Sequence, residues 1–257
     1  MWGIVPAAGI GSRIQPLAFS KELLPVGCLR DGNQERPRAI SEYLLERMAA
    51  GGASKICFVI SPGKSDIVEY YSDKTLGTDT GADINVDICY TVQPRPVGLC
   101  DAIFRAVPFI TPEEFVLVGL PDTVWFPQNG FTSLPDDDLS FLLFPVEHPE
   151  FFDAVVTDNS GSVLDIQVKQ PHPATSWVWG AFKLSGFTLR ALHELWLRRD
   201  RKDEFFGTLV NAYIAEGGNA KGIRAGEAYF DVGTLRGYRE AIRILSHDSS
   251  YTGQKAS

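Results

Sequence analysis

The fold is decided by the stretch Trp2-Gly-Ile-Val-Pro-Ala-Ala-Gly-Ile-Gly-Ser-Arg13 of this 257-residue chain. Its apolar first part, residues 2–5, predicts a buried strand that opens into a glycine-rich turn. Such a turn presents backbone N–H groups to an anion, and glycine lets a ligand approach the main chain closely because it has no Cβ. We therefore predict an anion site made by Ala7, Ala8, Gly9, Gly11 and Ser12.

Two cations follow this turn within a few residues. Arg13 can bind phosphate as a planar fork and Lys21 as a point charge. The P-loop pattern and the dinucleotide fingerprint are both absent, because Lys or a third Gly is missing where those motifs require it. Two glycines alone fit an ordinary strand-to-helix turn about as well. The added cations, with Pro25 closing the loop, favour a triphosphate site.

Composition narrows the class of protein. A net charge of -8 argues against a general nucleic-acid surface. No apolar run approaches the length that spans a membrane, and strand-like sequence begins at residue 2 without a basic leader, so we expect a cytoplasmic protein. The four cysteines lack C-x-x-C spacing and the four histidines form no ligand motif, which predicts structural roles for them.

Hydrophobic periodicity predicts an α/β chain. A helix capped by Ser41 and stopped by Gly51-Gly52 stands between two buried strands, the usual opening of a parallel sheet. Further strands are expected at 56–60, 86–92, 115–122, 139–146, 152–157, 163–168 and 176–182. Further helices are expected at 67–71, 99–107, 186–199, 205–216 and 235–245, with a mobile polar connection at 72–85. We predict one domain over residues 1–246 and a flexible tail over 247–257.

At this level the sequence resembles a known family. P-A-A-G-I-G-S-R-I-Q-P-L over 6–17 and S-K-E-L-L-P-V over 20–26 are similar to the signature of sugar-1-phosphate nucleotidylyltransferases, especially glucose-1-phosphate thymidylyl- and uridylyltransferases. The resemblance implies a GT-A-like, Rossmann-related fold with a mixed, mostly parallel central sheet. It also implies Mg²⁺-dependent transfer of a nucleoside monophosphate onto a sugar 1-phosphate, with release of pyrophosphate. Arg13 would then grip the β- and γ-phosphates and Lys21 the α-phosphate. The family often forms dimers or tetramers, so a homo-oligomer is left open.

The resemblance also indicates which residues recognise the nucleotide base. Gln93 and Gly98 fall where the family recognises the edge of a pyrimidine. An amide offers both a donor and an acceptor, so it can pair with uracil or thymine, and the pattern favours UTP or dTTP without choosing between them. The prolines of this segment would by themselves also fit a stiff strand-to-helix loop.

Two acidic residues are candidate metal ligands. Asp122 closes a predicted strand, a position that suits a ligand in an open α/β sheet and equally a turn residue. Asp231-Val-Gly-Thr234 resembles the family's second metal motif. By that resemblance Asp122 and Asp231 would together hold Mg²⁺ on the α-phosphate, which requires them to meet in the fold.

The middle of the chain departs from the family. Lys169-Gln170-Pro171 stands where Glu-Lys-Pro is usual, and on a strand a shift by one residue turns a side chain to the opposite face. Phe152-Asp153 stands where an aromatic-Gly pair is typical. The candidate sugar-phosphate residues are Lys21, Asp153, Lys169, Trp179 and Gly180, although the sequence favours core packing over a sugar contact for Trp179.

These departures leave two alternatives to the sugar-1-phosphate reaction. The first is a cytidylyltransferase that acts on a polyol or amino-alcohol phosphate. The second is a sensor of nucleotides or sugar nucleotides that keeps the fold without the activity. The presence of Arg13, Lys21, Asp122 and Asp231 together argues against the sensor.

Overall fold

The computed structural model describes residues 1–31, 34–72, 76–77 and 83–245. The predicted tail over 247–257 and much of the predicted connection over 72–85 lie outside these residues. The domain boundary at residue 246 therefore stays a prediction.

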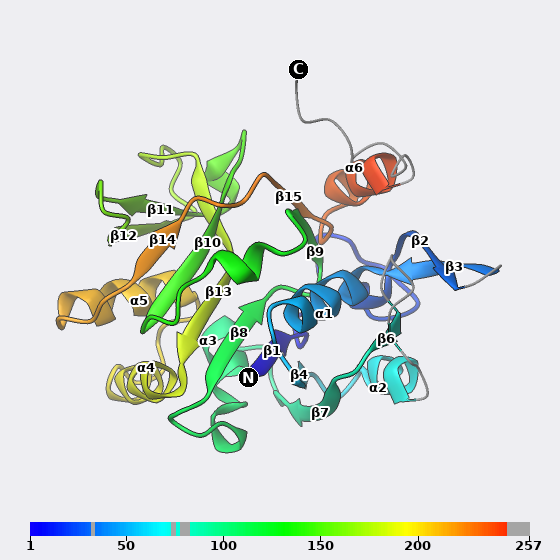
Figure 1. Cartoon of the computed structure of the whole chain (residues 1–257), viewed down its shortest axis with the longest axis horizontal. Coiled ribbons are helices and arrows are strands. Elements are labelled where there is room, and N and C mark those ends of the chain that lie inside the picture. The colour runs from blue at the N-terminus through cyan, green and yellow to red at the C-terminus, as the bar shows by residue number, and fades with distance from the viewer. Residues whose placement is uncertain (32–33, 73–75, 78–82, 246–257) are drawn as a thin grey trace.

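A nine-stranded mixed sheet forms the centre of the molecule (Figure 1). Its strands are β1 (Trp2–Pro6), β4 (Lys55–Ile60), β7 (Asp87–Val92), β8 (Phe115–Gly119), β10 (Leu139–Pro145), β11 (Asp153–Thr157), β12 (Val163–Val168), β13 (Trp177–Ser185) and β14 (Lys221–Ile223). The main path is β12-β11-β13-β8-β1-β4-β7, and β10 pairs with both β13 and β14. Within the described residues, β12 and β13 run against the remaining strands of this sheet. The predicted mixed, mostly parallel sheet is confirmed.

Helices cover both faces of the sheet. They are α1 (Ile40–Ala50), α2 (Ser65–Ser72), α3 (Leu99–Phe104), α4 (Gly186–Arg198) and α5 (Phe206–Ala215). Helix α6 (Leu235–Leu245) packs beside the sheet instead. Successive residues of a strand point to opposite faces, so Ile4 packs with side chains of α3, α4 and α5, whereas Val5 packs with those of α1 and α2. This double burial explains the continuous apolar runs of β1, β4 and β8.

A smaller unit beside the sheet was not predicted. It comprises the hairpin of β2 (Pro25–Asp31) and β3 (Gln34–Ala39) and the pair β9 (Thr123–Phe126) and β15 (Ala228–Asp231). Helix α6 lies against β2 and β15 (Figure 1). A core around Val26, Val124 and Val232 joins these parts. This unit positions Asp231, one of the two predicted metal ligands.

Short elements complete the described chain. Strands β5 (Leu76–Gly77) and β6 (Asp83–Ile84) pair with each other. The 3-10 turns are η1 (Lys21–Leu23), η2 (Val107–Phe109), η3 (Gly130–Ser133) and η4 (Pro149–Phe151). None of the helices in the described ranges combines the length and the apolar character that a membrane span needs.

Three local predictions are wrong in detail. Ser41 does not cap α1, which begins at Ile40. The Ser41 hydroxyl is buried and donates to the Glu22 carbonyl oxygen at 2.7 Å. The helix predicted over 99–107 ends at Phe104, and the turn η2, which carries a Pro in its first turn, follows it. The strand predicted over 115–122 ends at Gly119, which leaves Asp122 in the turn before β9.

Candidate functional site

Asp122 and Asp231 meet at the edge of the sheet although 108 residues separate them. Asp122 lies in the turn between β8 and β9, and Asp231 ends β15, which pairs with β9 in antiparallel register. The Val232 N–H donates to the Asp122 carbonyl oxygen at 2.9 Å. A Cβ at Gly233 would lie 2.7 Å from Asp122 Oδ2 and 2.9 Å from Asp231 Oδ1. Both carboxylates therefore border one small space.

The two predicted cations reach the same space. Lys21 Nζ lies 2.5 Å from Asp122 Oδ2, and Arg13 Nη1 lies 3.0 Å from Asp231 Oδ2. The Lys21 and Asp122 side chains are only 14% and 11% exposed, whereas Arg13 is 61% exposed. Lys21 is thus held in a buried position in the site. Arg13 pairs with Asp231 from the solvent-exposed side.

Electrostatics sets the two carboxylates apart. Burial would raise the pKa of Asp122, but the Lys21 ammonium outweighs it and holds that pKa below its usual value. Burial and the negative charge of Asp122 raise the pKa of Asp231. Burial would lower the pKa of Lys21, but Asp122 and Glu22 raise it above its ordinary value. The site therefore holds charged groups in a poorly solvated place.

This donor set fits Mg²⁺. Hard carboxylate oxygens suit the ion, which usually takes one or two of them together with substrate phosphates and water. No group of three or more His, Cys, Asp or Glu that could hold a metal occurs among the residues that the structure describes. If the ion binds here, Asp122 and Asp231 would be its protein ligands, and phosphate oxygens with water would complete the shell.

The glycine turn lies against Lys21. Gly11 has φ +70°, and a Cβ there would lie 2.7 Å from Lys21 Cδ. A Cβ at Gly9 would lie 3.9 Å from Lys21 Nζ. Ala7 and Ala8 are buried behind the turn, and Ser12 is exposed. Glycine at position 11 thus lets the lysine stem pass between the turn and Asp122.

The residues predicted to read the base lie in the loop after β7. Gln93 is buried, and its Nε2 donates to the Gly98 carbonyl oxygen at 3.0 Å and to Asp101 Oδ2 at 2.9 Å. Gly98 has φ +114°, and a Cβ there would lie 2.7 Å from the backbone of Glu204. Packing against Glu204 therefore requires glycine at 98 for a reason that the sequence did not reveal. The role of both residues in base recognition stays a prediction.

Two of the candidate sugar-phosphate residues are packed into the protein. Trp179 is buried and contacts the rings of Phe141 and Phe182, at centroid distances of 6.2 and 5.6 Å. Gly180 lies under the Tyr229 ring, because a Cβ there would stand 2.4 Å from Tyr229 Cε2. Trp179 thus packs in the core, as the sequence favours.

Asp153 and Lys169 lie near each other at the ends of β11 and β12. Burial raises the pKa of Asp153, and Lys169 partly offsets that rise. Lys169 follows the end of β12 with φ 45°, and its Nζ lies 4.5 Å from the centroid of the Phe205 ring. The predicted change of strand face is therefore wrong, because the strand ends at Val168. Binding of a sugar phosphate by these residues stays a prediction.

One pair of functional candidates was missed. Lys64 Nζ donates to both carboxylate oxygens of Glu22, each at 2.7 Å, directly behind Lys21. Lys64 lies in the loop after β4, at the same edge of the sheet as the glycine turn. Because ligands bind beyond the carboxyl ends of such strands, its place after the predicted strand 56–60 was a usable signal.

Comparison with known proteins agrees with this geometry. The sequence model of the family described as nucleotidyl transferase matches residues 2–247. The chain belongs to the nucleotidyl transferase family. The family predicted from the signature at residues 6–26, sugar-1-phosphate nucleotidylyltransferases, is confirmed, and with it the enzyme class.

Curated relatives of this nucleotidyl transferase are distant. The low-salt glycan biosynthesis nucleotidyltransferase Agl11 from Haloferax volcanii is 27% identical over 68% of this chain, which spans only 46% of that protein. The glucose-1-phosphate thymidylyltransferase from Neisseria meningitidis is 26% identical over 95% of this chain and 82% of its own length.

Among solved structures, the UTP-bound UGPase from Acinetobacter baumannii superposes with a TM-score of 0.76 at 20% identity. That match covers 96% of this chain and 94% of the other. The likeness supports the predicted fold class.

Proposed function

We propose that this nucleotidyl transferase transfers a nucleoside monophosphate from dTTP or UTP to a sugar 1-phosphate and releases pyrophosphate. The observation that carries this proposal is the meeting of Asp122 and Asp231 with Arg13 and Lys21 beside the glycine turn. Two relatives add support, since one is named a glucose-1-phosphate thymidylyltransferase and a similar fold is described with UTP bound.

The reaction is an in-line displacement. An oxygen of the sugar phosphate attacks the α-phosphorus, the bond from that phosphorus to the bridging oxygen breaks, and pyrophosphate leaves. Such a transfer needs little covalent chemistry from the protein, so positioning and charge stabilisation supply most of the rate. Mg²⁺ held by Asp122 and Asp231 would neutralise the charge that develops on the phosphates.

Each cation has a distinct task in this proposal. Lys21 is buried and fixed, so it stabilises charge at the α-phosphate without moving. Arg13 is exposed, so it turns from Asp231 to the departing pyrophosphate. The N–H groups of residues 9–12 hold the same phosphates from the turn.

Specificity is assigned to two other places. Gln93 and Gly98 would recognise the pyrimidine. Asp153, Lys169 and Gly180 would border the sugar phosphate, with Trp179 supporting them from the core. The two alternatives, a cytidylyltransferase and a non-catalytic sensor, gain no support from the family or from the relatives.

The test is a panel of dTTP, UTP, CTP and ATP crossed with several sugar 1-phosphates and polyol phosphates, scored for pyrophosphate in the presence of Mg²⁺. We expect release only with dTTP or UTP and a sugar 1-phosphate. Arg13→Ala and Asp231→Asn should each lower the rate by about a hundredfold or more. Arg198→Gln, which alters the exposed pair of Arg198 with Glu216, is the matched control. Turnover with CTP and polyol phosphates alone, or full activity in both variants, would contradict the proposal.

A further inference from the structure

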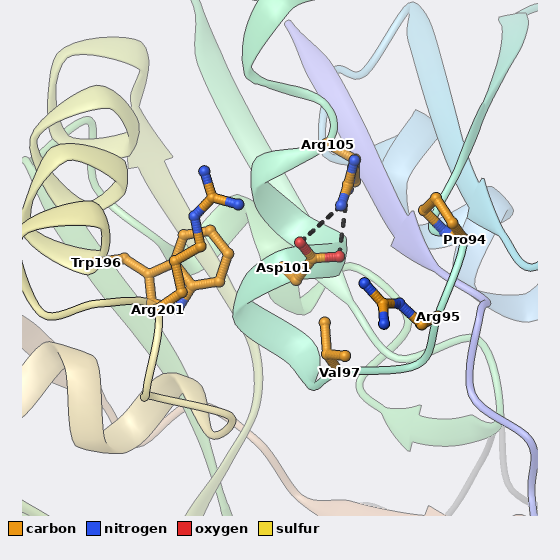
Figure 2. A pocket seen from close by; sticks show the side chains of 7 residues that line it. All are labelled: Pro94, Arg95, Val97, Asp101, Arg105, Trp196 and Arg201. Carbon is orange, nitrogen blue, oxygen red and sulfur yellow. Dashed lines mark hydrogen bonds and ion pairs between the residues drawn. The ribbon is translucent and has the colours of Figure 1, made fainter.

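A cavity rich in arginine is lined in part by Pro94, Arg95 and Val97 of the loop after β7 (Figure 2). It has a volume of about 310 Å³, and Arg95, Arg105, Arg201, Asp101 and Trp196 are among its lining residues. A second hollow of about 340 Å³ shares four of its lining residues, so the two form one groove. Neither hollow is lined by the glycine turn or by the paired carboxylates. We call this groove the arginine cavity.

The charge of the arginine cavity is opposite to that of the chain. Three arginines and one aspartate line its first hollow, in a protein with a net charge of -8. Arg105 pairs with Asp101 at 2.9 Å, whereas Arg95 and Arg201 make no ion pair among the described residues. Figure 2 shows the three arginines arranged around Asp101. Guanidinium groups bind phosphate oxygens in pairs of hydrogen bonds, so the cavity suits a phosphate group.

An unfavourable backbone conformation places Arg201 in this cavity. Asp200 and Arg201 are consecutive non-glycine residues in the left-handed region, with φ of 56° and 58°. This conformation is costly for residues with a Cβ. The Arg201 N–H bonds to the Trp196 carbonyl oxygen at 2.9 Å, and its guanidinium lies 5.6 Å from the centroid of the Trp196 ring. Such strain persists where the surrounding structure enforces it, often at ligand sites.

The arginine cavity is joined to the base-reading loop by two contacts. Asp101 Oδ2 accepts hydrogen bonds both from Arg105 Nε at 3.2 Å and from Gln93 Nε2 at 2.9 Å. The Leu99 N–H donates to the Glu204 carbonyl oxygen at 2.8 Å, three residues after Arg201. A phosphate bound to Arg105 would compete with Asp101, and the hydrogen bond that orients Gln93 would change with it.

We propose that a phosphate ester of a small metabolite binds the arginine cavity and regulates the affinity of the enzyme for its nucleoside triphosphate. Arg95, Arg105 and Arg201 bind the phosphate, and Asp101 transmits the effect to Gln93. Binding at the cavity is independent of the proposed function. The proposed regulation rests on the proposed function, because the regulation requires that Gln93 contacts the nucleotide.

Calorimetry with three probes tests the site: inorganic phosphate, ribose 5-phosphate and AMP, each with and without saturating dTTP and Mg²⁺. We expect at least one of the two esters to bind more tightly than inorganic phosphate. In the variant R95Q/R201Q the affinity for that ester should fall by about tenfold or more. The variant R198Q/R243Q removes two exposed arginines outside the cavity lining and is the matched control. Thermal unfolding of both variants checks that they fold.

The outcomes separate the site from its effect. Failure of both esters to bind, equal binding of inorganic phosphate and the esters, or unchanged affinity in R95Q/R201Q would overturn the site. If the ester binds, its presence should change the dissociation constant of dTTP by about fivefold or more, and dTTP should change that of the ester by the same factor. No mutual change would overturn the regulation. None of these readouts needs turnover, so the failure of the transferase assignment would be recognised separately.

Discussion

The buried pair of Glu22 and Lys64 gives a sharp prediction about stability. Glu22 is fully buried, and Lys64 Nζ supplies hydrogen bonds to both of its carboxylate oxygens at 2.7 Å. Lys64→Met keeps an unbranched side chain of similar size and removes the ammonium, which leaves the buried Glu22 carboxylate without its hydrogen-bonded partner. Breaking a buried ion pair in this way costs about 3–5 kcal/mol. Because neither side chain is appreciably exposed, no reduction for solvent screening applies.

The loss should depend on pH in a defined direction. Burial already raises the pKa of Glu22 above 4.5, and Lys64 opposes that rise. Without Lys64 the folded-state pKa of Glu22 rises further, while its unfolded value stays near 4.5. A raised carboxyl pKa means that the folded state binds the proton more tightly. The deficit of Lys64→Met is therefore smallest below the unfolded pKa, grows as pH rises toward the folded pKa, and is complete above it.

Urea unfolding at about pH 5 and about pH 8 measures this effect. The double variant Glu22→Gln/Lys64→Met should recover most of the stability, because no buried charge remains. Lys202→Met, which removes an exposed lysine from its pair with Asp200, should leave stability unchanged. A deficit of Lys64→Met below about 1 kcal/mol at the higher pH, or one that is the same at both pH values, would refute the reasoning.

Three further predictions concern the site. Gly233→Ala places a methyl group against the carboxylates of Asp122 and Asp231. The Mg²⁺ concentration for half-maximal pyrophosphate release should therefore rise about tenfold, while the unfolding temperature stays constant. An unchanged Mg²⁺ dependence would contradict this. Gly98→Ala introduces a strained φ and a clash with the Glu204 backbone, so the KM for the nucleoside triphosphate should rise and stability should fall by about 1 kcal/mol or more, as steady-state kinetics and urea unfolding would measure. Because the pKa of Asp231 is raised, Mg²⁺ affinity should weaken as pH falls through that pKa; calorimetric titration with Mg²⁺ in the presence of dTTP checks this, and tighter binding at lower pH would count against it.

Local patterns predicted the elements whose own sequence carries a clear apolar run or a glycine turn. The strand at residue 2, its glycine turn and the parallel strands follow from apolar runs and from glycine chemistry. The hairpin of residues 25–39 was missed because its polar sequence lacks the alternation that marks a half-buried strand. Periodicity could not show its pairing, because that pairing depends on contacts with α6, more than 190 residues away.

The candidate site was predictable residue by residue, but not as an assembly. Asp122 and Asp231 each stood out in a local motif, yet their contact depends on the pairing of β9 with β15. The same limit applies to Gly98, whose neighbour Glu204 belongs to a distant loop. The place of Lys64 after the predicted strand 56–60 was a usable signal, but its partner Glu22 lies 42 residues away and local patterns could not reveal that pairing.

The ion pairs of Arg13 with Asp231 and of Lys21 with Asp122 make the resting site electroneutral. A metal ion that binds alone would have to displace Arg13 and Lys21 from the carboxylates. A triphosphate that binds alone would draw the same two cations away from Asp231 and Asp122. When metal and triphosphate bind as one complex, the charged groups exchange partners. The metal then binds the two carboxylates, and the phosphates bind Arg13 and Lys21. We therefore expect this protein to admit the metal–nucleotide complex as a unit and to bind either component poorly by itself.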